Sequence, residues 1–342
     1  MSFIQFLPED SVISSELITA PMWTGNAYAL TASFSSSAQE TSTSGKSYLN
    51  VYNLAFDASG SEVQYAIAYG HISGSGSALF NSGVNEKSPT RDVYGQFRNV
   101  AYGDEAAVFN FGGTGGRSRD IFVLSVNRSK YKESVNPGTW GLTLTNGAST
   151  VYLTDDSKDS SVVNFIGGNR VYYIVSGTLG KSWNTSSIQT NSGSYGLFFP
   201  DMGTFILNPR ALALAYADGG ISLSVTETAA TSYSLGYNIN NTALYKAISA
   251  GQYFAGRSQE TISSRFFFVN AKSGQLNYTT NPSIIDTNGN VLYSTLIDNP
   301  QTYPTTIGMY NETGELLAVA KLSKPLPKDF TKQLTCRVKL EF

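Results

Sequence analysis

The 342-residue chain contains one histidine and one cysteine. A zinc site built from Cys and His side chains needs more ligands than these, so it is excluded. Catalysis by a serine and histidine pair would depend on His71 alone, and no G-x-S-x-G motif supplies the nucleophile. A lone histidine beside glycine is typically a structural side chain. Cys336 lies in the alternating run "LTCRVKLEF", which predicts a buried or half-buried thiol on a strand. We therefore predict no catalytic residue, no metal and no cofactor.

Charged residues are also scarce, at 14% of the chain against about 25% in an average soluble protein. With a net charge of −2, the chain has no excess of basic residues to attract a nucleic-acid backbone or an anionic membrane. The surface must therefore be polar and uncharged, and Ser, Thr, Asn, Gly and 21 Tyr supply it. Neutral polar groups desolvate at lower cost than charges. Such a surface is common both on proteins buried in large assemblies and on secreted sugar binders.

Long hydrophobic runs are absent as well. The longest, "ALALAYA" at residues 211–217, is far shorter than the roughly 20 residues that span a bilayer. The N-terminal "MSFIQFLPEDSVIS" has no basic region, and Gln5 and Pro8 interrupt its apolar residues. It is therefore not expected to be a secretory signal. We expect a soluble chain that is made in a cytoplasm.

What the sequence does contain is a period of two, with frequent Thr, Val, Ile, Tyr and Phe between turn residues. Several of the runs are almost continuously apolar, which predicts strands covered on both faces. The expected strands are residues 48–56, 61–73, 105–111, 120–128, 140–145 and 170–177.

Three stretches have the start and stop signals of helices. Ser88 and Pro89 are suited to the N-cap and the first helical position, and Gly103 to the stop. Residues 209–218 begin on a proline, and residues 241–251 run from an asparagine cap to a glycine. The predicted fold is mainly β with a few short helices (α+β), with antiparallel sheets arranged like a β-sandwich.

The predicted domain organisation has three parts. Residues 1–46 form an N-terminal arm that ends in a Ser/Thr-rich linker, "SFSSSAQETSTSGK". Residues 47–200 form a β-rich domain with one helix. Residues 201–342 form an α+β segment that ends in C-terminal hairpins.

Two polar motifs have compositions that also occur in ligand sites. "NFGGTGGRSRD" at residues 110–120 lacks the spacing of a phosphate loop and precedes a strand, so a glycine-rich hairpin connection is expected. "LTDDSKDSS" carries Asp155, Asp156 and Asp159 but lacks the Gly and Glu of a calcium loop, so a solvated turn is expected. Carboxylate pairs for glycoside cleavage are not excluded by spacing on a chain with 25 acidic residues.

Residues 178–196, "TLGKSWNTSSIQTNSGSYG", place Trp183 and Tyr195 among small polar residues. That mixture indicates either an ordered contact loop or a partly disordered one, and we favour the contact loop.

The C-terminal region has a clear strand pattern. Residues 305–322 read as a hairpin turned at Gly314, and "SKPLPKDF" (323–330) as an extended strap. Residues 331–342 then return as a last strand, so that hairpin and strand close a sheet edge. Residues 282–298 read as a further hairpin, turned by "NG".

Five stretches between Ser125 and Phe342 carry a further signal: "SVNRSKYKESVNPGTWGLTLT", "LTDDS", "TNSGSYGLFFPDMGTFILNPRAL", "QETISSRFFFVNAKSGQLNYTTNPS" and "NPQTYPTTIGMYNETGELLAVAKLSKPLPKDFTK". On these stretches the chain resembles virion structural proteins of T4-like contractile-tailed phages, especially marine and cyanobacterial ones. One departure is Pro304, where similar sequences have an aliphatic residue.

This resemblance implies a non-enzymatic virion component, located in the contractile tail at the baseplate or at the neck and fibre attachment. Its partners would be other virion subunits and copies of itself, assembled in the host cytoplasm. The alternatives are a carbohydrate-binding adhesin, with Trp23 and Trp183 stacking on sugars, and a glycan depolymerase. The candidate interface residues are Trp183, Tyr195, Tyr310, Leu316, Leu317, Pro325, Pro327 and Phe330.

Overall fold

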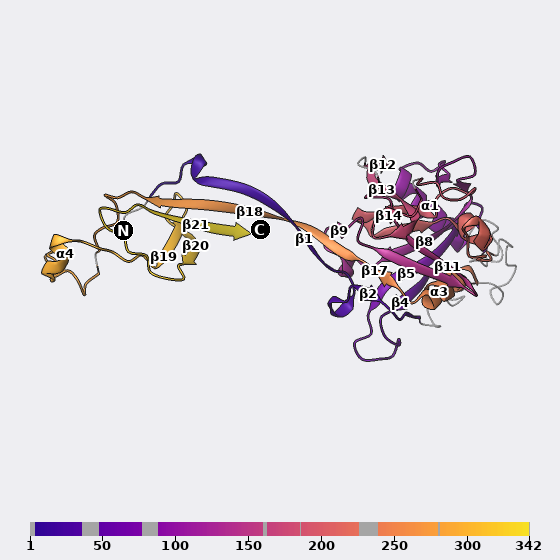
Figure 1. Cartoon of the computed structure of the whole chain (residues 1–342), viewed down its shortest axis with the longest axis horizontal. Helices are drawn as coiled ribbons and strands as arrows, with labels where there is room; N and C mark the ends of the chain where they lie inside the picture. Colours follow the sequence, from indigo (N-terminus) through magenta and orange to yellow (C-terminus); the bar gives the residue numbers. More distant parts are fainter. Residues whose placement is uncertain are drawn as a thin grey trace. The chain divides into compact units, whose positions relative to one another are not determined.

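The computed structural model describes residues 4–35, 48–76, 88–159, 163–184, 186–225, 239–279 and 281–341. It confirms a mainly β chain with antiparallel sheets and a few helices (Figure 1). The chain divides into two compact units. Residues 18–260 form one, called the sheet unit here, and residues 1–17 with 261–342 form the other, the terminal unit. Strands β1 (Ser11–Pro21) and β18 (Arg257–Ala271) each begin in one unit and end in the other.

These bounds differ from the breaks expected after residues 46 and 200. The large sheet continues past residue 200, because β16 (Thr204–Leu207) pairs with both β15 (Gly196–Phe199) and β8 (Asp120–Val126). The N-terminal arm also contains an 11-residue strand, β1, where no strand is expected from the sequence.

The sheet unit is built on one large, curled sheet of 13 described strands. In spatial order these are β2 (Ala29–Leu30), β17 (Phe254–Ala255), β10 (Gly141–Asn146), β11 (Ser149–Asp155), β13 (Asn169–Thr178), β15, β16, β8, β5 (Val63–His71), β4 (Tyr48–Tyr52) and β3 (Phe34–Ser35), with β12 (Asn164–Ile166) and β14 (Lys181–Ser182) paired to β13.

The central strands are buried on both faces, as their apolar runs predict. On β8, Phe122 and Leu124 enter one core cluster, whereas Ile121 and Val123 enter the other. Successive side chains of a strand point to opposite faces, so one uninterrupted apolar run supplies both clusters.

Aromatic rings fill the inside of the curl. Tyr65 on β5 and Phe254 on β17 have six strands between them in the sheet order, yet their ring centroids lie 5.3 Å apart. Phe254 also lies 5.6 Å from Phe205, which packs 4.7 Å from Trp140. The sheet therefore bends round one aromatic core and brings distant strands together inside it.

Helices cover the two core clusters. Helix α1 (Pro89–Tyr102) begins after Ser88 and ends at Gly103 in the left-handed conformation, as expected. The Ser88 hydroxyl donates to the Gly74 carbonyl instead of capping the helix. Helix α3 (Ile239–Gly251) begins before Asn241, its expected N-cap, and includes Gly251, its expected stop.

The third predicted helix is shorter than its sequence pattern. Helix α2 (Pro209–Ala213) is capped by the Asn208 side chain, which accepts from the Arg210 amide. Leu214 then leaves the helical region, and a 3₁₀ turn at Tyr216–Asp218 follows.

The glycine-rich stretch forms the hairpin expected from its sequence. Strands β6 (Phe109–Asn110) and β7 (Arg117–Ser118) pair antiparallel around it. Gly112 and Gly113 have positive φ, which glycine adopts without the steric cost that other residues meet.

Among its described residues, the terminal unit contains part of the sheet of β1, β18 and β21 (Leu334–Glu341), the sheet of β19 (Thr306–Tyr310) and β20 (Leu316–Lys321), and the short helix α4 (Ser294–Asp298). Strand β21 returns to pair with β18, from Ala271↔Leu334 to Ser264↔Glu341. Strands β19 and β20 form the predicted hairpin, with Gly314 at positive φ, as a separate two-stranded sheet.

The region read as a further hairpin, residues 282–298, differs from its prediction. The turn forms, with a single bridge between Ile285 and Val291, but the expected second strand gives way to helix α4 (Ser294–Asp298). The Asp286 carboxylate accepts the amides of Asn288 and Asn290, so local side-chain bonds shape the turn without a longer ladder.

Removal of residues 331–342 tests the role of β21. The truncation would expose the edge of β18 and uncover the apolar face that the buried Cys336 and Val338 cover. We expect the truncated chain to be recovered mostly as aggregate, whereas the exposed substitution Thr335→Ala leaves it soluble. Size-exclusion chromatography of the soluble fraction measures this, and a soluble, assembly-competent truncated chain would contradict the prediction.

Candidate functional site

His71, the single histidine, has a structural position. It is buried at the end of β5, and its Nδ1 accepts the backbone amides of Ser73 (3.2 Å) and Ser75 (3.3 Å). A neutral ring with its proton on Nε2 satisfies both bonds. The ring therefore organises the turn after β5.

Cys336 likewise matches its predicted role. The thiol is buried on β21, and burial raises its pKa, so the reactive thiolate is disfavoured.

The acidic stretch is not the solvated turn that its sequence predicts, because Asp155 and Asp156 are buried. The Asp155 carboxylate accepts the amides of Gly138 (2.8 Å) and Ser157 (3.0 Å). Burial raises the pKa of Asp155, and likewise that of Asp156. The error has a physical reason: a carboxylate that accepts backbone amides can be buried, and composition alone does not show those donors.

Asp156 connects the acidic turn to the aromatic loop, residues 178–196. Its carboxylate accepts the Tyr173 amide (3.0 Å) and the Ser187 hydroxyl (2.6 Å). A second carboxylate, that of Asp159, accepts the Ser182 amide at 2.6 Å. Two stretches that the sequence singles out separately are therefore one structure, and the first part of the loop is ordered by the turn beside it.

The two aromatic residues of this loop have opposite environments. Trp183 is 62% exposed, and its ring centroid lies 5.5 Å from that of Tyr152 on β11. Tyr195 is buried, and its hydroxyl donates to the Gly219 carbonyl (2.6 Å). Tyr195 is thus a core residue and not an interface residue. Trp23, named for the adhesin alternative, is also buried, against Phe254.

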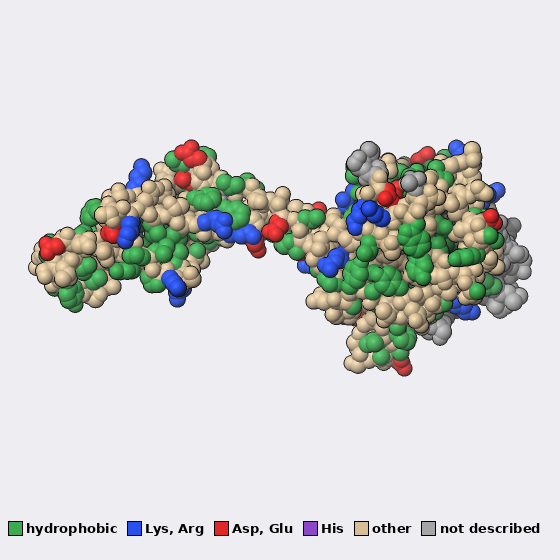
Figure 2. All heavy atoms as spheres, in the orientation of Figure 1, with side chains coloured by type: hydrophobic (Ala, Val, Ile, Leu, Met, Phe, Trp, Pro, Cys, Tyr) green, Lys and Arg blue, Asp and Glu red, His purple; other side chains and the backbone are tan. Residues whose placement is uncertain are grey.

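The other six candidate interface residues lie in the terminal unit, and all are exposed: Tyr310, Leu316, Leu317, Pro325, Pro327 and Phe330. They belong to a larger set of exposed apolar side chains of the terminal unit, which we call the terminal apolar surface; apolar side chains of this unit are seen among polar ones in Figure 2. Because adjacent strand residues such as Val12 and Ile13 point to opposite faces, the set covers more than one face. Its further large exposed side chains, missed from the sequence, are Leu7, Val12, Ile13, Leu17, Tyr278, Leu292, Tyr293, Ile297, Tyr303 and Val319.

The terminal unit has little core to balance this surface. Among its described residues the buried apolar side chains are Ala271, Met309, Cys336 and Val338. Both large core clusters are made of sheet-unit residues. Alternating apolar residues on β19 and β20 predict strands correctly, but only the three-dimensional structure shows that Met309 is buried while Leu316 and Leu317 are exposed.

The strap is held by Lys328. Its ammonium is buried and donates to Asn277 Oδ1 (2.7 Å) and to the carbonyls of Ser273 (2.8 Å) and Asp329 (2.9 Å). Thr302 and Lys328 also exchange both backbone hydrogen bonds. These bonds fix the strap and so place Pro325, Pro327 and Phe330 at the surface. Lys328 lies between Pro327 and Asp329, and nothing in this local sequence indicates that its ammonium is buried, so this anchor was not predicted.

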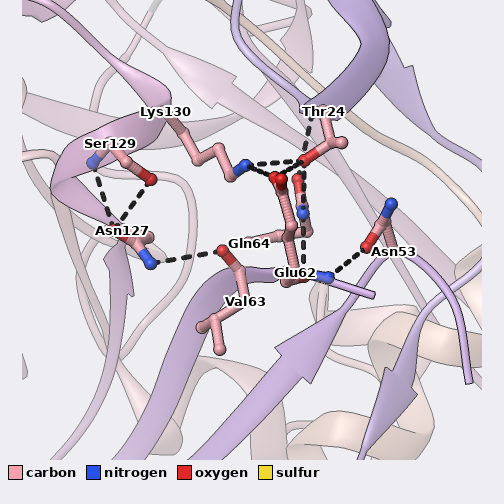
Figure 3. Close-up of polar contacts among 8 residues, drawn as sticks. All are labelled: Thr24, Asn53, Glu62, Val63, Gln64, Asn127, Ser129 and Lys130. Atoms are coloured by element: carbon pink, nitrogen blue, oxygen red, sulfur yellow. Dashed lines mark hydrogen bonds and ion pairs between the residues drawn. The ribbon is translucent and has the colours of Figure 1, made fainter. Parts of the chain in front are cut away.

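A polar network joins three segments of the sheet unit (Figure 3). Lys130 pairs with Glu62 and donates to Thr24 Oγ1 (2.6 Å), which also accepts from Gln64 Nε2 (2.7 Å). The Lys130 hydrogen bond lowers the pKa of the Glu62 carboxyl. Because Thr24 directly follows the buried Trp23, the network holds the segment that carries Trp23 next to the start of β5.

Comparison of the chain with family models, with curated proteins and with solved structures finds no match in any of the three. Within the described residues, no group of three or more His, Cys, Asp or Glu side chains lies together as metal ligands would. No helix in the described ranges combines the length and apolar character needed to cross a bilayer.

Replacement of His71 tests its structural role. His71→Ala removes the acceptor of two backbone amides and leaves a cavity, so we expect the free energy of unfolding to fall by about 2–4 kcal/mol. His71→Asn places Oδ1 near the position of Nδ1 and should recover part of this loss. Urea unfolding of both variants measures the difference, and equal stability of the alanine variant and the parent chain would disprove the role.

The buried Asp155 predicts a pH dependence. Because its pKa is raised in the folded chain, the folded state retains a proton that the unfolded state releases above about pH 4. This contribution to stability falls as pH rises toward the raised pKa. Asp155→Asn keeps an oxygen acceptor and does not titrate, so the stability of the parent chain relative to the variant should decline with rising pH. Urea unfolding across the acidic and neutral range would refute this if the difference stayed constant or grew.

Proposed function

We propose that this protein is a non-enzymatic structural component of a phage virion, in the contractile tail at the baseplate or at the neck and fibre attachment. The single observation that carries the proposal is the terminal apolar surface on a unit with few buried apolar side chains. The resemblance of residues 125–342 to virion structural proteins is the reason for proposing a phage virion as the assembly.

The size of this surface supports an interaction with other chains. It includes 14 large apolar side chains, each of which exposes on the order of 100 Å². Their sum is roughly 1,000 Å² or more, spread over more than one face, whereas each partner contributes approximately 800 Å² to one standard interface. A part of this area on one face, together with its polar rim, would therefore form an interface, and other faces would remain for further partners. An obligate interface resembles a domain core divided between two chains. The terminal unit lacks a large core of its own, so such an interface would complete it.

Charge is compatible with contacts between copies of the chain. Residues 1–17 and 261–342 carry eight basic and nine acidic residues, so the terminal unit is close to neutral and does not repel a second copy. The hairpin of β19 and β20 also forms a sheet of only two described strands, which leaves edges for a neighbouring strand. We propose that its partners are copies of itself and other virion subunits, joined during assembly in the host cytoplasm.

A charge on the terminal apolar surface tests the proposal. Leu317 is 68% exposed, so Leu317→Glu should leave the fold intact while adding a charge that must be desolvated on assembly. We expect at least about tenfold weaker association, or exclusion from particles. Phe165→Glu is the matched control, because Phe165 is 66% exposed on the sheet unit.

The measurements are sedimentation of the purified chain over a range of concentrations and incorporation of tagged variants into tail-bearing particles. Parental incorporation and association of Leu317→Glu would refute a role for this surface. Particles that contain neither the parent chain nor any variant would refute the virion assignment.

A further inference from the structure

We propose that Trp183 and Tyr152 form a carbohydrate-binding platform on the sheet unit, on which a pyranose ring of an oligosaccharide stacks. This inference is independent of the structural role proposed for the terminal unit, since it uses residues of the sheet unit only.

The geometry of the aromatic pair provides the first argument. The two rings are 5.5 Å apart with a 60° angle between their planes, and Trp183 and Tyr152 are 62% and 46% exposed. The Trp183 Nε1 donates to Thr178 Oγ1 at 3.2 Å, which restrains the orientation of the indole. An exposed, oriented indole beside a second ring presents aromatic faces to the C–H groups of a sugar.

The second argument is that the segment carrying Trp183 is held before any ligand binds. The Gly180 amide donates to Thr154 Oγ1 (2.8 Å), and the Gly180 carbonyl accepts the Lys158 amide (3.0 Å). One residue before Trp183, the Ser182 amide donates to Asp159 Oδ2. These bonds order the platform in advance and so reduce the entropy lost on binding.

The surroundings favour a sugar over other stacking ligands. The neighbours of Trp183 in the chain, Lys181, Ser182 and Asn184, are polar and can bond to sugar hydroxyls. An apolar protein partner would prefer a continuous apolar patch. Single-stranded nucleic acid would need a basic groove along its backbone, and the chain has a net charge of −2.

Tryptophan fluorescence can test the platform directly. The chain has three tryptophans, and Trp23 and Trp140 are buried, so acrylamide should quench mainly Trp183. The probes are cellohexaose, maltohexaose, chitohexaose and mannohexaose, added to the full chain. We expect at least one of them to protect Trp183 from acrylamide in a saturable manner. Protection by none of the four, or by oligo(dT) alone, would overturn the proposal.

Variants distinguish stacking from a general effect on the fold. Trp183→Ala and Tyr152→Ala should each weaken binding of the protective oligosaccharide at least tenfold by calorimetry, and Trp183→Phe should weaken it less than Trp183→Ala does. Phe165→Ala, which removes an exposed ring from β12, should bind like the parent chain. Asp159→Ala should weaken binding severalfold, and Asp159→Asn, which keeps an oxygen acceptor, should not. Unchanged affinity in Trp183→Ala, or equal loss in Phe165→Ala, would refute the platform.

Discussion

The sheet unit depends on one constraint: a large sheet with apolar side chains on both faces must cover both of them. On one face it curls until Tyr65 and Phe254, from strands far apart in the sheet, meet inside. Trp140 and Phe205 fill the same interior, while helix α1 contributes Val93 to the cluster on the other face. Aromatic rings suit this task because each buries a large area with few rotatable bonds.

The terminal unit shows the opposite balance. Its sheets have three described strands or fewer on each main path, few of its large apolar side chains are fully buried, and many are exposed. A chain segment of this kind gains little from folding by itself, because the hydrophobic free energy scales with the apolar area removed from water. The same area becomes stabilising when another chain covers it. This physical asymmetry between the two units is the reason for assigning assembly to the terminal unit.

In this protein, polar side chains of the types found in catalytic sites make structural hydrogen bonds, most of them to the backbone. His71 accepts two amides, Asp155 accepts two amides, and the buried ammonium of Lys328 donates to three oxygens. Burying such groups is costly unless their hydrogen bonds are made, so each one specifies the turn or strap that it satisfies. The Trp183 loop is held in a related way, since the buried carboxylate of Asp156 accepts the Ser187 hydroxyl and the exposed carboxylate of Asp159 accepts the Ser182 amide.

The sequence by itself determined the local features of this protein, because strand periodicity, the Pro89 and Gly103 helix signals and the C-terminal hairpin depend on neighbours in the chain. It also placed Trp183 and Leu317 among exposed candidates. Tertiary structure alone decided the burial of Tyr195 and Asp155, the unit boundaries and the extent of the terminal apolar surface. Burial depends on which distant segments cover a residue. Tyr195 and Trp183 have similar sequence surroundings, and only the packing of the sheet separates a core side chain from an exposed one.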